Sequence, residues 1–258
     1  NNSFIPVTAL DYSNKRDLPE DEWMISDEYK GGGDRLLKNE GSSFVDVTKE
    51  SGIYSSLIGF GLGVTTGDIN HDGYIDIFIS NDFYERDYLY INNGDGSFSE
   101  SLMDWVGHTS HSSMGADMAD LNNDGFMELF VTDMLPNEHK RLMEITDFEG
   151  YDVYRLKQNL GFGHQFMQNS LYWNNRNNTF SEIAYHSGVA ATDWSWGALM
   201  FDMDLDGYKD IFVANGIYHD LTNLDFMNYF ANDALVGLLN GKKTKVLDII
   251  EKMPSTPI

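Results

Sequence analysis

The chain of 258 residues carries 41 Asp and Glu against 17 Lys and Arg, which gives a net charge of −24. Such a surface repels phosphate backbones and argues against direct binding to nucleic acid, while it suits divalent cations and basic partners. The absence of cysteine excludes disulfides and thiolate sites, and no run of about 18 apolar residues predicts a membrane-spanning helix. The first residues lack the pattern of a signal peptide, so we expect a segment of a longer protein whose export signal would lie upstream.

The first recognisable elements are two short strands near the N-terminus. Arg35–Asn39 and Phe44 have the spacing of a strand, a turn and a second strand, which predicts a partial leading repeat over residues 1–50. The preceding segment, Asp11–Asp34, lacks the acidic pattern that follows.

An acidic loop then spans Asp68–Asp76, and the apolar run Ile77–Ile79 comes directly after it. An unbroken apolar run of this kind predicts a strand that is covered on both faces. Farther on, Tyr88–Asn92, an Asn- and Gly-rich turn and Phe98 predict a β-hairpin. Together these elements form one repeat, which we place at residues 51–104.

The same elements recur in a second copy at residues 105–186. Its acidic loop spans Asp120–Glu128, and an insertion at about residues 136–168 separates its second and third predicted strands. Within the insertion, Glu138–Glu144 and Tyr151–Leu160 are predicted to be helical.

A third copy begins at residues 187–219, where the acidic loop spans Asp202–Asp210. After it, apolar residues recur at helical spacing between Leu224 and Leu238, and Lys245–Lys252 predicts a further helix. We therefore predict a helical insertion over about residues 220–253.

Each repeat reads as strand, acidic loop, strand, connection, strand, Asn/Gly turn and strand. A glycine stands five residues before the first Asp of every acidic loop: Gly63, Gly115 and Gly197. Four-stranded units of this length predict the blades of a β-propeller. We therefore predict an all-β fold of about three to four four-stranded blades with helical insertions.

The acidic loops share the pattern Asp-x-Asx-x-Asp-Gly-x-x-Asp/Glu, which favours about three Ca²⁺ sites. Side-chain oxygens at positions 1, 3, 5 and 9, together with the carbonyl of position 7, can wrap one ion. Magnesium fits less well because it requires a near-ideal octahedron. The third loop has four carboxylates and should bind most tightly, whereas the longer Glu128 weakens the second site. The predicted metal ligands are Asp68, Asn70, Asp72, Tyr74, Asp76, Asp120, Asn122, Asp124, Phe126, Glu128, Asp202, Asp204, Asp206, Tyr208 and Asp210.

Two other interpretations of these loops are possible. An EF-hand requires a glutamate at position 12 and a helix on each side, but position 12 is Ile79, Val131 or Val213 within predicted strands. An EF-hand is therefore excluded. Metal-free Asx and glycine turns remain as the alternative.

The combined pattern resembles the FG-GAP/VCBS repeat, which also occurs in the propellers of integrin α-subunits. The longer context, including Phe44–Thr48, Asn81–Phe83, Asp87–Asn92 and Ala191–Gly197, is similar to the cartilage-acidic-protein (ASPIC/UnbV-associated) group and to surface VCBS-repeat proteins of Bacteroidota-type bacteria. This resemblance covers nearly the whole chain. It implies a seven-bladed ring, calcium in the blade loops, export from the cytoplasm, and adhesion or complex assembly. The chain holds too few repeats to close such a ring.

Sequence support for an enzyme is weak. No histidine pair has HExxH spacing, and Ser195 lacks the Gly-x-Ser-x-Gly pattern of a nucleophile elbow. Trp194 and Trp196 could stack on a sugar, although aromatic residues beside a strand more often pack in a core.

The sequence therefore predicts a non-catalytic, calcium-binding propeller of an extracellular or cell-surface protein, associated with the outer membrane if it is bacterial. Its partner would be a protein or a glycan at the cell surface, or the other subunits of an outer-membrane complex. The alternative is a carbohydrate-binding or polysaccharide-degrading propeller of the lyase type.

Overall fold

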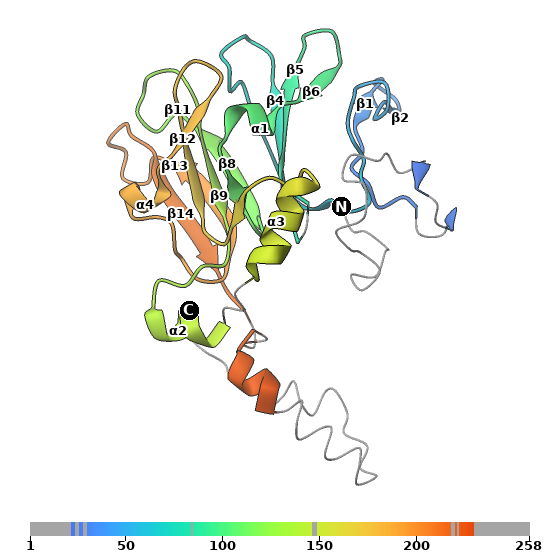
Figure 1. Cartoon of the computed structure of the whole chain (residues 1–258). Helices are drawn as coiled ribbons and strands as arrows, with labels where there is room; N and C mark the ends of the chain where they lie inside the picture. Colours follow the sequence, from blue (N-terminus) through green and yellow to red (C-terminus); the bar gives the residue numbers. More distant parts are fainter. Residues whose placement is uncertain are drawn as a thin grey trace.

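The computed structural model describes residues 22–23, 26–27, 30–83, 85–145, 149–217, 220 and 222–229. Within this part of the chain, antiparallel strands predominate, and the predicted all-β, propeller-like fold is confirmed. The described sheets stand side by side in an open row and do not close into a ring (Figure 1).

Two sheets contain a complete four-stranded unit. In the first, which we call blade one, the strands pair in the order β3 (Phe60–Gly67), β4 (Asp76–Asp82), β5 (Tyr88–Asn92) and β6 (Phe98–Glu100). In the second, blade two, the order is β8 (Gly115–Ala119), β9 (Glu128–Thr132), β11 (Ser170–Asn174) and β12 (Phe180–Glu182). Every pair in both blades is antiparallel, as the predicted repeat requires.

Two further sheets contain half of this unit each. The N-terminal hairpin pairs β1 (Leu37–Asn39) with β2 (Phe44–Asp46), and it corresponds to the third and fourth strands of a blade. The C-terminal strand pair joins β13 (Ser195–Phe201) to β14 (Asp210–Asn215), and it corresponds to the first and second strands.

The repeated glycines mark the places where the first strands of neighbouring units approach most closely. A Cβ atom built on Gly63 would lie 3.2 Å from the Cα of Gly115, and one built on Gly115 would lie 2.6 Å from the carbonyl oxygen of Trp196. A larger side chain at Gly115 would therefore push β8 and β13 apart.

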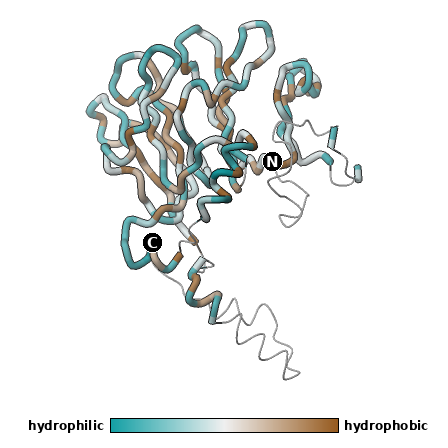
Figure 2. The backbone as a smooth tube through the Cα atoms, in the orientation of Figure 1, coloured by the Kyte–Doolittle hydropathy of each residue, from teal (hydrophilic) through white to brown (hydrophobic). Residues whose placement is uncertain are grey.

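The core consists of apolar layers between adjacent sheets, and Figure 2 shows the apolar residues concentrated along the strands. Buried residues between blade one and blade two include Phe78, Leu89, Met118, Leu129 and Val131. Buried residues between blade two and the C-terminal strand pair include Phe130, Leu171, Ala198 and Met200. Successive residues of β9 thus face opposite layers, which explains why the run after each acidic loop is apolar without alternation.

Helices occupy the connections between strands. α2 (His139–Ile145) and α3 (Tyr151–Asn159) lie between β9 and β11, and they confirm the two helices predicted in the insertion. Short helices α1 (Leu102–Trp105) and α4 (Ala184–Ser187) follow β6 and β12.

The insertion is attached to the propeller at two points. β7 (Thr109–Ser110) and β10 (Gln165–Phe166) form a short parallel pair that joins its end to the connection before β8. In α2, the buried guanidinium of Arg141 contacts Asp193 at 2.7 Å and Asp220 at 2.5 Å. These charge-assisted hydrogen bonds join the insertion to the segments on either side of the C-terminal strand pair.

The helix predicted between Leu224 and Leu238 is observed over residues 224–229. Its remainder and the helix predicted at Lys245–Lys252 lie outside the described residues. No helix in the described ranges is long and apolar enough to cross a membrane.

Two fully buried carboxyl groups lie at the end of the blades opposite the acidic loops. Asp87 accepts hydrogen bonds from the amide of Asn81 and the hydroxyl of Ser113, both at 2.8 Å. Burial raises the pKa of Asp87 and that of Asp133 to about 7. In blade two, Asn169 takes the place of Asp87 and accepts the equivalent bond from the Asp133 amide at 2.8 Å.

The close approach of the first strands predicts different outcomes for two similar substitutions. Gly115→Ala should lower the free energy of unfolding by about 1–3 kcal/mol, because its Cβ would meet backbone atoms that cannot rotate away. Gly197→Ala is the matched control, since its nearest neighbour would be the Cβ of Ala214 at an ordinary 3.9 Å. Urea denaturation of both variants measures the difference, and equal stabilities would contradict the packing account.

The buried carboxyl groups predict that stability falls as pH rises. Between an unfolded pKa of about 3.9 and the folded value near 7, the folded state binds more protons than the unfolded state, so stability is lost as pH increases through this window. Asp87→Asn should flatten this dependence, because Asn169 shows that the amide fits the equivalent position. Denaturation across the same pH range tests this, and an unchanged slope in the variant would refute it.

Candidate metal centre

The three acidic loops lie at the same end of the sheets. Loop one (68–76) joins β3 to β4, loop two (120–128) joins β8 to β9, and loop three (202–210) joins β13 to β14. Figure 1 shows loops one and two at the same end as the β5–β6 and β11–β12 turns.

The loops share one set of internal hydrogen bonds. The first Asp of each loop accepts from the amides at positions 5 and 6, at 3.0 and 2.9 Å for Asp68, 3.0 and 2.9 Å for Asp120, and 3.1 and 2.9 Å for Asp202. The side chain at position 3 also accepts from the amide at position 5. The carboxylate at position 5 accepts from the amide at position 7, which belongs to Tyr74, Phe126 or Tyr208. The predicted ligands at positions 1, 3 and 5 are therefore brought together in every loop.

The backbone of each loop enters the left-handed region twice. Glycine at position 6 has φ of 88° to 96° in the three loops. Position 4 has φ of 60° to 64° and carries His71, Asn123 or Leu205. Glycine in the loop pattern indicates the bend at position 6, but the pattern does not indicate the bend at position 4, because Leu205 has no preference for positive φ and His71 and Asn123 have only a modest one.

The carboxylate at position 9 begins the strand that follows the loop. Asp76 is fully buried and accepts from the amides of Ile69 at 2.9 Å and Asn92 at 2.8 Å. Glu128 is also fully buried; its Oε2 accepts from Leu121 at 2.8 Å, while its Oε1 makes no hydrogen bond of normal geometry, although the Asn174 backbone amide lies close enough to act on the carboxylate. Burial raises the pKa of both Asp76 and Glu128.

Two asparagines hold the loops from the neighbouring hairpin turns. The Nδ2 of Asn92 donates to the carbonyl of Ile75 at 3.0 Å, and the Nδ2 of Asn174 donates to the carbonyl of Met127 at 3.2 Å. Both carbonyls belong to position 8 of a loop. The sequence signal for this contact is an Asn-Asn pair that occurs in both hairpins, at Asn92-Asn93 and Asn174-Asn175, where local sequence alone predicts only a turn.

An arginine side chain from a neighbouring turn contacts loop two. The guanidinium of Arg176, from the β11–β12 turn, contacts the Oδ2 of Asp124 at 2.5 and 3.1 Å and lies 5.9 Å from the centre of the Phe126 ring. Desolvation raises the pKa of Asp124, but hydrogen bonds from the Phe126 amide and from Arg176 outweigh it, so the pKa is lowered overall. No local sequence pattern indicates this contact, because the two residues are 52 positions apart.

Neighbouring loops also touch each other through their position-4 residues. The ring of His71 lies 5.2 Å from that of Phe126, and the Nδ2 of Asn123 donates to the carbonyl of Gly207 at 2.8 Å. The three loops therefore form one row along the end of the sheets.

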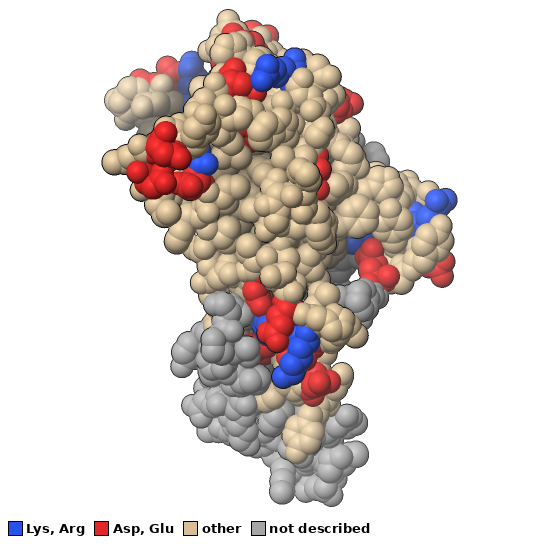
Figure 3. Space-filling model, turned by 90° about the vertical axis from the view of Figure 1, so that its left-hand side faces the viewer, with Lys and Arg blue, Asp and Glu red and all other residues tan. Residues whose placement is uncertain are grey.

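Loop three has the most concentrated negative charge. One carboxylate oxygen from each of Asp202, Asp204 and Asp210 lies within 4.8 Å of the others, and Asp210 accepts from the amide of Met203 at 2.9 Å. Figure 3 views the molecule from the side of β13 and β14, where acidic side chains gather in a compact cluster. Without a cation, carboxylates at this spacing repel one another.

The donors of these loops suit a hard divalent cation. At positions 1, 3, 5 and 9 they consist of carboxylate and amide oxygens, and the imidazole of loop one, His71 at position 4, lies beside the Phe126 ring of the next loop. The Oε1 of Glu128, which makes no hydrogen bond of normal geometry, is the kind of buried oxygen that a metal ion would satisfy. The residues present therefore fit calcium.

The candidate residues for catalysis and sugar stacking lie outside the acidic loops. Ser195 is fully buried, and its hydroxyl contacts that of Thr192 at 2.6 Å. Trp194 is half-buried, whereas Trp196 is 47% exposed and donates its indole N–H to the carbonyl of Gly216 at 2.6 Å.

Comparison with known families identifies the repeat. A model of the FG-GAP-like repeat matches residues 68–131 and 159–213, so each match ends in the strand after an acidic loop. A search of curated proteins found no match. The matched segments contain all three loops and the strands that follow them, so the chain carries FG-GAP-like repeats.

Proposed function

We propose that this chain is a non-catalytic, calcium-binding recognition module of an exported or cell-surface protein. FG-GAP-like repeats form β-propeller-type domains that commonly serve recognition or adhesion. The calcium proposal rests on the row of three loops. In each loop, the side-chain oxygens at positions 1, 3 and 5 accept the same set of hydrogen bonds from backbone amides and are held close together.

Calcium would act on stability in this proposal. Asp68, Asp120 and Asp202 are each surrounded by further carboxylates or amide oxygens of their own loop, so a bound cation would offset their repulsion. Such binding favours the folded state, because the unfolded chain does not hold these oxygens together.

The net charge of −24 supports a basic or neutral partner and not a nucleic acid. A cell-surface protein, a surface glycan or the other subunits of an outer-membrane complex would fit this requirement. These partners remain part of the proposal.

A glycan is favoured by one specific feature. A cavity of about 640 Å³ beside the insertion is lined by the aromatic side chains Tyr151, Tyr154, Phe166 and Tyr185, together with Gln168. Tyr151 and Tyr185 are exposed, and aromatic faces beside an amide are suited to stacking on a sugar ring. Binding to a glycan array would favour this candidate, whereas co-purification with a membrane complex without glycan binding would favour a protein partner.

Removal of calcium should destabilise the chain. We expect EGTA to lower the melting temperature and added calcium to restore it. Each site filled at a hundredfold excess over Kd should raise the free energy of unfolding by about 2.7 kcal/mol. Magnesium at the same concentration is the control and should restore less. A calorimetric titration that shows no heat of calcium binding at millimolar concentration would contradict the proposal.

Loop two should bind calcium more tightly when the positive charge of Arg176 is removed. Arg176→Gln should lower the Kd of loop two roughly fivefold, because an exposed ion pair with Asp124 is worth about 1 kcal/mol. Arg155→Gln, on the exposed side of α3, removes the same charge far from the loops and should leave the Kd unchanged. Calorimetry in a background with loops one and three disabled by Asp72→Ala and Asp206→Ala measures this, and equal Kd values for the two variants would argue against competition.

A further inference from the structure

The cavity beside the insertion opens among exposed aromatic rings. Tyr151 is 71% exposed, Tyr185 is 67% exposed and Phe166 is 44% exposed, and all three line the cavity. Tyr151 and Phe166 belong to the insertion of blade two, which is complete and has a described sheet on either side. Exposed aromatic side chains that gather around a cavity of this size are typical of a ligand site.

Three of the rings follow one another with similar orientations. Tyr151 and Tyr154 are three residues apart in α3 and share a face of the helix; their ring centres lie 6.4 Å apart and their planes differ by 31°. The centre of the Phe166 ring, in β10, lies 6.4 Å from that of Tyr154, and the two planes differ by 28°. Rings of such similar orientation suit a flat ligand, whereas an aromatic cage encloses a cation from several directions.

Contacts behind these rings hold them in place. The hydroxyl of Tyr154 lies 2.7 Å from the Nδ1 of His164. The Phe166 ring meets the ring of His108 edge to face, with centres 5.3 Å apart and planes 67° apart. Because the rings are fixed before a ligand arrives, binding loses less side-chain entropy than it would on free side chains.

A polar cluster with balanced charge adjoins the rings, and two of its members, His111 and Glu149, line the cavity. The buried ammonium of Lys157 contacts the Oε1 of Glu149 at 2.7 Å and the Nε2 of His111 at 3.1 Å. Since an ammonium group donates, Nε2 accepts, and the proton of the neutral imidazole lies on Nδ1, 3.2 Å from the hydroxyl of Ser112. Burial and the neighbouring Lys157 lower the pKa of His111 to about 4, so this imidazole is neutral at pH 7. The cluster therefore has a net charge of zero.

This cluster disfavours charged ligands of either sign. A cationic ligand would approach the ammonium of Lys157, while an anionic ligand would have to displace Glu149 and would be repelled by the net charge of −24. A neutral ligand with hydroxyl groups avoids both costs. The carboxylate of Glu149 can accept hydrogen bonds from such groups, and the side-chain amide of Gln168, which also lines the cavity, can donate and accept.

We propose that this cavity binds a neutral oligosaccharide, whose sugar rings stack on Tyr151 and Tyr185 and whose hydroxyl groups bond to Glu149 and Gln168. The proposal rests on the recognition function proposed for the chain, to which it adds a ligand class and a site. Figure 1 shows α3 away from the end of the sheets at which loops one and two lie. The sugar site and the calcium sites are thus separate.

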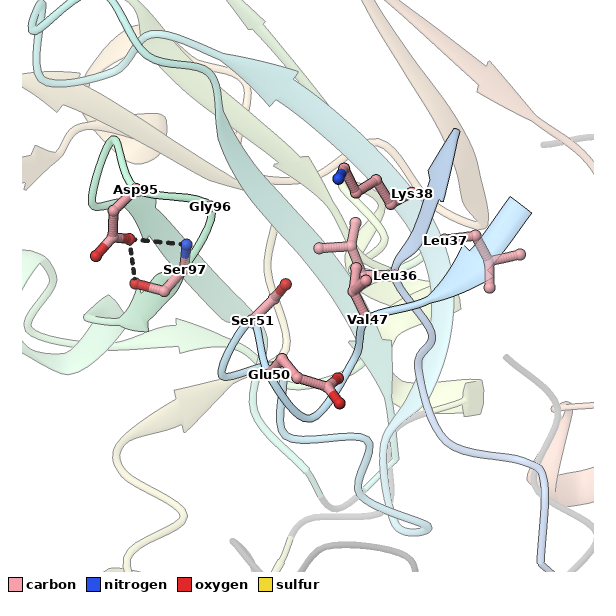
Figure 4. Close-up of a pocket in the computed structure, with 9 residues that line it drawn as sticks. All are labelled: Leu36, Leu37, Lys38, Val47, Glu50, Ser51, Asp95, Gly96 and Ser97. Atoms are coloured by element: carbon pink, nitrogen blue, oxygen red, sulfur yellow. Dashed lines mark hydrogen bonds between the residues drawn. The ribbon is translucent and has the colours of Figure 1, made fainter. Parts of the chain in front are cut away.

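A second cavity provides an internal contrast. It lies beside the N-terminal hairpin, has a volume of about 700 Å³ and is lined by aliphatic and polar side chains, among them Leu36, Val47, Glu50 and Asp95 (Figure 4). The described residues around it include no aromatic ring. We therefore expect no stacking on sugar at this cavity, and a variant there serves as a control.

Glycan binding by the whole chain tests the proposal. The probes are the neutral hexamers of glucose, mannose and xylose and the acidic hexamer of galacturonic acid, immobilised on an array in the presence of calcium. At least one neutral hexamer should bind, and the galacturonate hexamer should not. The neutral hexamer that binds is then titrated in solution by calorimetry.

Substitutions in the cavity identify the site. Tyr151→Ala and Tyr185→Ala should each raise the Kd of the neutral hexamer roughly tenfold, because each removes one stacking surface. Tyr229→Ala removes a tyrosine that is 68% exposed and does not line the cavity, and Glu50→Gln alters the cavity of Figure 4; both should leave the Kd unchanged. Glu149→Gln leaves Lys157 without its counter-ion, so it should raise the affinity for the galacturonate hexamer relative to the neutral one.

Several results would overturn the proposal. They are failure of every hexamer to bind, binding of the galacturonate hexamer alone, an unchanged Kd in both Tyr151→Ala and Tyr185→Ala, and an unchanged preference in Glu149→Gln. A protein partner that co-purifies with the unmodified chain and is lost with Tyr151→Ala, in the absence of glycan binding, would make the cavity a protein-binding site instead. None of these results bears on calcium, because the effect of EGTA on the melting temperature decides that proposal separately.

Discussion

Close packing of the first strands of successive repeats is the constraint on which the rest of the molecule depends. At Gly63 and Gly115, the neighbouring backbone leaves space for a hydrogen atom in place of a Cβ. This approach aligns the sheets in one direction and brings all three acidic loops to the same end. It also explains why the strands after the loops are apolar on both faces, since each lies between two core layers.

The row of loops concentrates negative charge on a rigid support. Asp68, Asp120 and Asp202 are each held by two backbone amides, so the carboxylates cannot move apart to relieve their repulsion. Arg176 relieves part of this repulsion in loop two, while loop three has the acidic cluster. The loops therefore differ in electrostatics although their backbones are the same.

The two half-blades differ from the complete blades in the exposure of their apolar residues. In the described part of the chain no strand lies over Phe212, and Leu37 is exposed in the same way on the other side of the molecule. A propeller-type repeat buries its apolar layers against neighbouring sheets, so the half-blades expose residues whose equivalents are buried in the complete blades.

The sequence by itself determined the repeat, the loop residues and the two helices of the insertion, because these features depend on short spacings along the chain. The carboxylates at positions 1, 3 and 5 converge through hydrogen bonds within one turn, and that turn needs no distant residue. Tertiary structure alone decided which distant groups meet the loops: Arg176 reaches Asp124 across 52 residues, and Asn174 reaches Ile69 across 105. Such contacts depend on strand order and on stacking between sheets, which local sequence does not encode.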